Sequence, residues 1–224
     1  MLHFFTVNSF FIFYFLFVLS IGNKVTKQHE ISRKFVHIWL CAWYFLCINL
    51  CQNVFEAIFT PFIFIIIACL VISGNIHLNS ILNLIRKGEV PIGIVTFPFS
   101  LFIMVILNYY FFNDWRVGCV GIIALALGDS FAAIIGISYP VYRYKIFSSE
   151  KTLSGNLAMF LSSFLSIFIF LFLYEHFPIS YMLFISFSLA VLACVVEAIT
   201  PFGLDNLTIP LIISSFYNFV GRIL

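Results

Sequence analysis

Long apolar runs fill almost the whole chain and leave only short polar connections between them. A hydrocarbon core about 30 Å thick requires roughly 17–25 apolar residues per helix. Eight segments fit or approach that length, and we predict each to be a transmembrane helix: 4–21, 35–51, 54–73, 92–112, 117–138, 156–174, 179–199 and 207–222. The last is marginal in length, and a tilted, re-entrant or half-buried helix would fit it as well. The sequence therefore predicts an all-α, polytopic membrane helix bundle.

Charge is too scarce for a water-soluble surface. Only 9% of the residues are charged, whereas soluble domains average roughly 25%. The net charge of +2 argues against a nucleic-acid partner. The connections are too short for a soluble domain, so we expect residues 1–224 to form one membrane domain. Because segment 4–21 lacks a basic flank and a small-residue cleavage site, we expect it to be a retained, peripheral first helix.

Along the eight predicted spans, connections rich in Lys and Arg alternate with connections that carry few of them. Two cations, Arg116 and Arg222, fall on one side of the membrane. The other side receives Lys24, Lys27, Arg33, Lys34, Arg86, Lys87, Arg143, Lys145 and Lys151. Since cytosolic loops carry an excess of Lys and Arg, this second side is predicted to be cytosolic, with both chain ends outside.

The first polar group on that side leads into the second predicted helix. Glu30, Arg33, Lys34 and His37 share one helical stripe, since their spacing is i, i+3, i+4 and i+7. The general excess of cations at cytosolic helix ends would account for the presence of Arg33 and Lys34. It accounts less well for the presence of Glu30 and His37 on the same helical face. We interpret the stripe as part of a functional site.

The second polar group is Gly128-Asp129-Ser130, within segment 117–138. Asp129 lies nine residues from the predicted cytosolic end, about 14 Å deep at 1.5 Å per residue. An ionisable residue at such depth indicates a functional site, although pairing with a Lys or Arg of another helix is the structural alternative. The small side chains of Ala132, Ala133 and Gly136 on the same face would admit another helix or a ligand.

The third and fourth polar groups lie at later helix ends. Lys151, Thr152, Ser154 and Gly155 precede a helix N-terminus, which favours an anion such as a phosphate, with simple helix capping as the alternative. Glu197 ends segment 179–199, and the loop that follows carries Asp205, Asn206 and Thr208. Asp205 or Thr208 could equally cap the last helix.

Four of these segments, in this order, resemble the polyprenol kinase family, which includes dolichol, phytol and farnesol kinases and the CTP-dependent diacylglycerol kinase, and which is related to phosphatidate cytidylyltransferase. The resemblance rests on Arg33-Lys34-Phe35-Val36-His37, on the run from Ala126 to Gly136, on Lys151 to Gly155, and on Asp205 to Pro210. It spans a core of about residues 30–210.

The resemblance implies transfer of the terminal phosphate of a nucleoside triphosphate, typically CTP, to a lipid alcohol such as phytol, farnesol or dolichol, with a divalent metal such as Mg²⁺. It marks Arg33, Lys34, Asp129 and Gly136, and more loosely Lys151, Gly155, Asp205 and Asn206. The segment from Tyr139 to Lys145 departs from the Gly-rich, basic pattern of the family, which leaves CTP, UTP and ATP open as donors.

Combining the motifs with the chemistry of the residues, we predict three overlapping sets. Catalysis is assigned to Asp129, Lys151, Arg33 and Lys34. Nucleotide binding is assigned to Arg33, Lys34, His37, Gly136, Lys151, Thr152, Ser154, Gly155 and Asn206. Oxygen ligands suit Mg²⁺, so metal binding is assigned to Asp129, Asp205 and Glu197.

Other functions remain as alternatives. A diacylglycerol kinase or a phosphatidate cytidylyltransferase would use similar parts, although the His-Gly-Gly ending of the latter is missing from this chain. A transporter could use Asp129 and Glu197 as an ion relay. Transporters tend, however, to carry internal repeats and midplane sites, and no repeat is visible in this sequence.

The predicted sidedness can be tested by cysteine labelling in a cysteine-free background. A cysteine at Ser149 should react with a membrane-impermeant thiol reagent only after the cytosolic side is opened, and one at Asn113 should react from outside. Labelling of position 149 from outside would contradict the topology.

Overall fold

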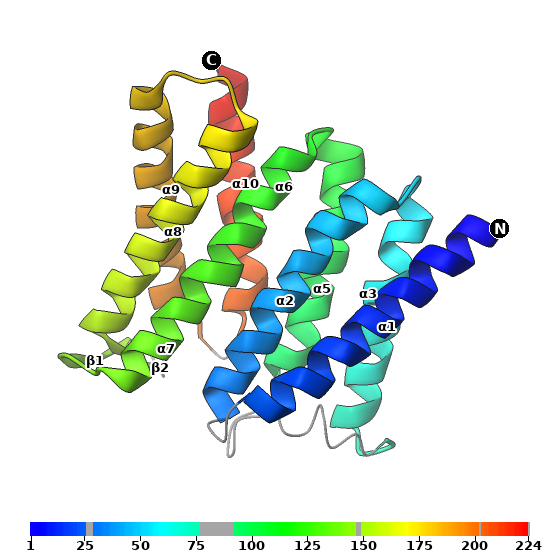
Figure 1. Ribbon diagram of the computed structural model, residues 1–224. Helices are drawn as coiled ribbons and strands as arrows, with labels where there is room; N and C mark the ends of the chain where they lie inside the picture. Colours follow the sequence, from blue (N-terminus) through cyan, green and yellow to red (C-terminus); the bar gives the residue numbers. More distant parts are fainter. Residues whose placement is uncertain (26–28, 77–91, 147–148, 202, 224) are drawn as a thin grey trace.

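The computed structural model describes residues 1–25, 29–76, 92–146, 149–201 and 203–223 (Figure 1). Nearly all of this part is helical. The helices are α1 (Leu2–Val25), α2 (His29–Leu50), α3 (Val54–Ile72), α5 (Ile92–Leu107), α6 (Trp115–Ile123), α7 (Ser130–Ser138), α8 (Leu153–Tyr174), α9 (Ile179–Ile199) and α10 (Asp205–Ile223), with π-helical turns η1 (Asn108–Phe112) and η2 (Ala124–Asp129). The predicted all-α, polytopic helix bundle is confirmed.

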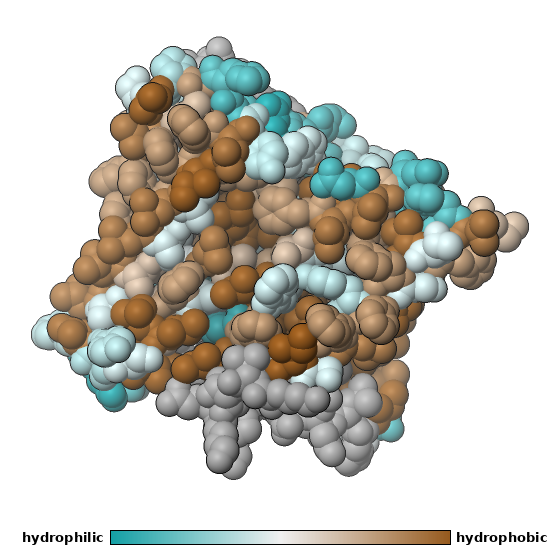
Figure 2. Space-filling model, in the orientation of Figure 1, coloured by the Kyte–Doolittle hydropathy of each residue, from teal (hydrophilic) through white to brown (hydrophobic). Residues whose placement is uncertain are grey.

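Seven helical segments in the described part are long and apolar enough to cross a membrane. They are Leu2–Gly22, Ile31–Leu50, Val54–Ile72, Ile92–Phe112, Trp115–Ser138, Leu153–Tyr174 and Ile179–Ile199. Segment 207–222, predicted as a marginal eighth span, lies within α10, which is helical but less apolar than most of the other helices and is not among the seven. Figure 2 shows a visible face that is largely apolar along the helices.

The helices run up and down in alternation, so the bundle has two distinct ends (Figure 1). Both chain termini lie at the upper end of the view. The start of α2, the short hairpin and the connection from α9 to α10 lie at the lower end, called the inner end below. Helix α10 packs against α5, α6 and α9, and α8 packs against α7 and α9. The predicted polar groups are therefore gathered at one end, while the identity of that side as cytosolic stays a prediction.

The sequence predicted one helix over 117–138. The span that carries Asp129 is instead interrupted and is not one regular α-helix. It consists of α6, the π-helical turn η2 and α7, and η2 ends at Asp129. A π-helical turn is wider than an α-helical one, so it changes which face the following residues present. Such turns occur frequently at functional sites.

The connection between α7 and α8 is an antiparallel hairpin, and the sequence analysis predicted no strand in this segment. Strand β1 (Arg143–Ile146) pairs with β2 (Ser149–Thr152), and Tyr144 lies opposite Lys151. The Tyr144 hydroxyl also hydrogen-bonds the amide of Asn156 in α8. The hairpin therefore gives Lys151 a defined position at the inner end of the bundle.

Two glycines let the helices around the Asp129 span approach closely. A Cβ atom on Gly121 would lie 2.2 Å from Ser214 Oγ and 2.4 Å from the carbonyl oxygen of Pro210 in α10. A Cβ atom on Gly128 would lie 2.3 Å from Ser163 Oγ in α8. Small residues at helix interfaces are a common means of close packing in membranes. The α6–η2–α7 span is therefore held tightly between α8 and α10.

We predict that Gly121→Ala lowers the stability of the protein in detergent. The added methyl group has no room against the α10 backbone, and overpacking of this kind typically costs about 1–3 kcal/mol. Gly221→Ala is the matched control, since a Cβ at that exposed α10 position meets no neighbour. Thermal unfolding should show a clear drop in Tm for Gly121→Ala alone; equal Tm values for the two variants would contradict the tight α6–α10 contact.

Candidate functional site

A buried ion pair joins α2 to the π-helical turn. The ammonium of Lys34 donates a hydrogen bond to Asp129 Oδ2, and the two residues are only 5% and 3% exposed. A carboxylate or an ammonium inside a membrane is costly unless it is paired or reaches water. The structure thus shows Asp129 paired with a lysine of another helix, the structural alternative that the sequence left open.

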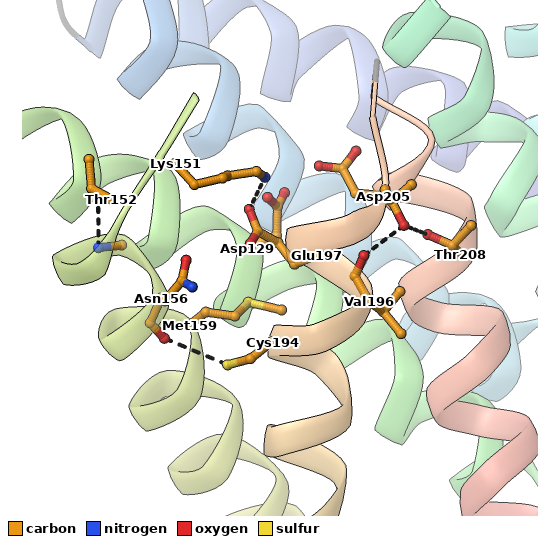
Figure 3. Close-up of polar contacts among 12 residues, drawn as sticks. Asp129, Lys151, Thr152, Asn156, Met159, Cys194, Val196, Glu197, Asp205 and Thr208 are labelled. Atoms are coloured by element: carbon orange, nitrogen blue, oxygen red, sulfur yellow. Dashed lines mark hydrogen bonds and ion pairs between the residues drawn. The ribbon is translucent and has the colours of Figure 1, made fainter. Parts of the chain in front are cut away.

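A second ion pair joins the hairpin to α9. Lys151 donates to Glu197 Oε1, while Glu197 Oε2 is buried and has no hydrogen-bond partner among the described groups. Burial alone would lower the pKa of Lys151, but the neighbouring carboxylates, chiefly Glu197 together with Asp205 and Asp129, outweigh this effect and hold the pKa above its usual range. Lys151 is therefore charged at neutral pH. Figure 3 shows its side chain extended toward Glu197 and Asp129.

A third carboxylate, Asp205, lies in the same neighbourhood (Figure 3). It is half-buried at the start of α10 and accepts a hydrogen bond of 3.0 Å from the backbone N–H of Asn206. Burial and the negative charge of Asp129 raise the pKa of Asp205. The three carboxylates predicted as metal ligands are thus near enough to influence one another electrostatically. In the described part of the chain, however, no group of three or more His, Cys, Asp or Glu side chains is placed to hold a metal ion.

The other described members of the α2 stripe lie beside the first ion pair. Arg33 is half-buried, and its positive charge acts on Asp205. His37 is buried, and its ring packs on Phe97 of α5 with 4.4 Å between the ring centroids. The side chain of Glu30 lies outside the described residues. The predicted stripe therefore contributes Arg33, Lys34 and His37 to one place.

The predicted phosphate-binding segment is a capped and closely packed helix start. Thr152 Oγ1 accepts a 3.0 Å hydrogen bond from the Gly155 N–H, which is an N-cap, and Ser154 Oγ accepts one of 3.2 Å from the Val141 N–H. A Cβ on Gly136 would lie 2.9 Å from Thr152 Oγ1. The small face of α7 at Gly136 therefore admits α8. Nucleotide binding by Gly136, Thr152, Ser154 and Gly155 stays a prediction.

The start of α10 is fixed to the start of α5. The side-chain amide of Asn206 donates to the carbonyl oxygen of Gly93 at 3.2 Å, and the hydroxyl of Thr96 donates to that of Gly203 at 2.8 Å. Asn206, predicted to bind nucleotide, thus has a structural contact. These bonds hold Asp205 at a defined place on the inner end.

Some predicted features lie beyond the described residues. Lys27, Arg86 and Lys87 fall outside them, as do the side chains of Lys24 and Arg222. Within the described part, sequence reasoning left pairing of Asp129 as an alternative without naming Lys34 as the partner, and it missed the Lys151–Glu197 pair. The two residues of each pair are 95 and 46 positions apart in the sequence. Both lysines also fitted the expected excess of Lys and Arg on the inner side, so neither stood out as a pairing partner.

Comparison with known proteins supports a kinase relationship for part of the chain. The chain is 34% identical to a phytol kinase of Synechocystis over 93 residues, which make up 41% of this chain and 39% of that relative. This similarity supports a relationship to the polyprenol and phytol kinases, as the motifs suggested. No family model matches the chain, and no solved structure matches it.

The energetic coupling of Lys34 and Asp129 can be measured by a double-mutant cycle. Lys34→Met or Asp129→Leu alone leaves one buried charge unpaired, which typically destabilises a protein by about 3–5 kcal/mol. The double variant removes both charges, so we expect it to recover most of that loss. Reversible unfolding in mixed micelles measures each variant; strictly additive losses would contradict a direct pair.

Proposed function

We propose that this protein transfers the terminal phosphate of a nucleoside triphosphate to a lipid alcohol at the inner end of its helix bundle. One observation carries the proposal: two lysines, each held by a buried carboxylate, lie near a third carboxylate, Asp205, at the inner end of the bundle. The partial similarity to a phytol kinase supports the same chemistry.

The three cations would bind the phosphates of the donor. Phosphoryl transfer depends mainly on positioned phosphates and on neutralisation of their charge. Lys151 reaches the site from the hairpin, and Arg33 and Lys34 reach it from α2, so they would approach a triphosphate from two directions. Glu197 and Asp129 hold the two ammonium groups in place before the nucleotide arrives.

Asp129 is the group that we assign as the proton acceptor. The alcohol oxygen forms a bond to the terminal phosphorus, the bond from that phosphorus to the donor's bridging oxygen breaks, and the hydroxyl proton passes to the Asp129 carboxylate. The products are a lipid monophosphate and a nucleoside diphosphate. The ion pair with Lys34 keeps the carboxylate ionised, as a base must be.

The carboxylates fit a metal ion that arrives with the nucleotide better than a preformed protein cage. Mg²⁺ is usually held by one or two carboxylates together with substrate phosphates and water. Asp205, Glu197 through its unpartnered Oε2, and Asp129 are the residues that would supply those oxygens. When bound, Mg²⁺ would reduce the negative charge of the phosphates.

The choice of donor, acceptor and membrane side rests on the sequence motifs and on the similarity to a phytol kinase. We propose CTP as donor and an isoprenoid alcohol such as phytol, farnesol or dolichol as acceptor, with the site facing the cytosol. Diacylglycerol as acceptor and formation of a CDP-lipid are the nearest alternatives within the same chemistry. An ion relay through Asp129 and Glu197 is the alternative from another class of protein.

The proposal predicts lipid phosphorylation by the purified protein. Labelled CTP, UTP and ATP should be tested with phytol, farnesol, dolichol and diacylglycerol, with Mg²⁺ present or chelated. We expect a labelled lipid monophosphate that requires Mg²⁺. Nucleotide-independent ion flux in liposomes, without any phosphorylated lipid, would contradict the proposal.

Two variants test the assigned roles. Asp129→Asn keeps the shape and an oxygen that can accept the Lys34 hydrogen bond, so it should be less destabilising than Asp129→Leu, but it removes the base. We therefore expect kcat to fall by about a hundredfold or more in protein that is still folded. Lys151→Ala should raise the nucleotide KM or lower kcat by roughly one to two orders of magnitude, at about 1.5–3 kcal/mol per charge-assisted bond. The matched control is Lys145→Ala, because Lys145 lies exposed in the same hairpin. Equal kinetics for the two lysine variants would remove Lys151 from the site.

A further inference from the structure

The hairpin that carries Lys151 is too small to hold its position unaided. Each strand has four residues, and an isolated two-stranded hairpin is at best marginally stable in water. Its base is closed by the Leu153 N–H, which donates to the carbonyl oxygens of Val141 and Tyr142 at 3.1 Å each. Lys151 lies beyond this base, so its position depends on what else fastens the hairpin to the bundle.

A side chain of β1, Tyr144, provides such a fastening. Tyr144 lies opposite Lys151 in the register of the sheet, and directly opposite residues of an antiparallel pair project from the same face. The Tyr144 hydroxyl accepts a hydrogen bond from the side-chain amide of Asn156, in the first turn of α8. This face of the hairpin therefore reaches the bundle at two points, through Lys151 at Glu197 and through Tyr144 at Asn156.

Asn156 also contacts the helix that carries Glu197. The Cys194 thiol of α9 donates to the backbone carbonyl oxygen of Asn156, with 3.6 Å between Sγ and the oxygen (Figure 3). Cys194 precedes Glu197 by three residues, so both lie on the same side of α9. A closed ring of contacts thus runs from the hairpin through α8 and α9 and returns to the Lys151–Glu197 pair.

We propose that Tyr144 and Asn156 are positioning residues, which hold Lys151 where it meets the phosphates of the donor. This inference rests on the proposed function and adds two residues that lie outside the three predicted sets. The long, flexible stem of a lysine must be ordered before its ammonium binds a phosphate. The ring of contacts orders the stem in advance, so less affinity is lost when the nucleotide binds. Neither Tyr144 nor Asn156 needs to touch the nucleotide.

Chemical modification tests the position of Lys151 without nucleotide or catalysis. The protein in nanodiscs is treated briefly with an amine-acetylating reagent, and mass spectrometry measures modification of Lys151 relative to Lys145, which is exposed in the same hairpin. The reagent attacks the neutral amine, and an ammonium held by a carboxylate rarely loses its proton. We expect slow modification of Lys151 in the wild type and a rise by about threefold or more in Tyr144→Phe. An unchanged ratio would overturn the inference.

Nucleotide affinity tests the consequence for binding. The probe is whichever of CTP, UTP and ATP the wild type binds best with Mg²⁺, and calorimetry measures its Kd. Tyr144→Phe removes the hydroxyl and keeps the ring, so we expect Kd to rise by about three- to tenfold. The matched control is Tyr142→Phe, because the Tyr142 side chain is 74% exposed two positions earlier in the chain. Equal Kd values for the two variants would contradict a positioning role of Tyr144.

Combined variants show whether the two residues act through Lys151. In a Lys151→Ala background, Tyr144→Phe should leave Kd unchanged, because no ammonium remains to be positioned. Asn156→Leu should raise Kd about as much as Tyr144→Phe does, and the double variant should be no worse than either single one. Full additivity in either combination would show that the residues act separately, against the inference.

The outcomes separate positioning from the proposed function. Faster modification of Lys151 in Tyr144→Phe, in a protein whose wild type binds no nucleoside triphosphate, would support placement of Lys151 by Tyr144 and contradict the proposed function. Weaker nucleotide binding by Lys151→Ala, with neither modification nor affinity changed in Tyr144→Phe, would support the function and overturn the positioning role.

Discussion

The structure depends on a constraint of the bilayer, in which a charged side chain must be paired or must reach water. Lys34 and Asp129 satisfy it by pairing with each other, and this joins α2 to the π-helical turn between α6 and α7. Lys151 and Glu197 pair in the same way and join the hairpin to α9. The two ion pairs thus join four separate parts of the chain, two by two, at one end of the bundle. The same charges form the candidate site.

Close helix packing keeps these charges in place. Gly121 and Gly128 bring the Asp129 span against α10 and α8, and Gly136 meets the capped start of α8. The start of α10 is tied to α5 through Asn206. Several residues that motifs assign to nucleotide binding thus have packing or capping contacts, and they would act on a ligand by holding the neighbouring charges rigidly.

The sequence alone predicted the fold class, most of the spans and the gathering of polar groups at one end, because apolar length and charge alternation are local signals. It could not predict that η2 is π-helical, since Ala124–Asp129 has no composition that distinguishes it from an α-helix. It missed the hairpin, because Arg143–Ile146 and Ser149–Thr152 are short and polar. It listed pairing for Asp129 only as an alternative. The partner is 95 residues away, and Lys34 also fitted the expected inner anchoring. The roles of individual site residues in nucleotide and metal binding stay predictions.

We propose that the inner site moves a terminal phosphate onto a lipid hydroxyl. The most direct measurement uses two batches of nucleoside triphosphate, one labelled at the terminal phosphate and the other at the phosphate nearest the sugar, with the product lipid isolated from each. We expect label in the lipid only from the terminally labelled donor, with nucleoside diphosphate as the second product. Lipid label only from the other donor, with release of pyrophosphate, would show a nucleotidyl transfer and contradict the claim.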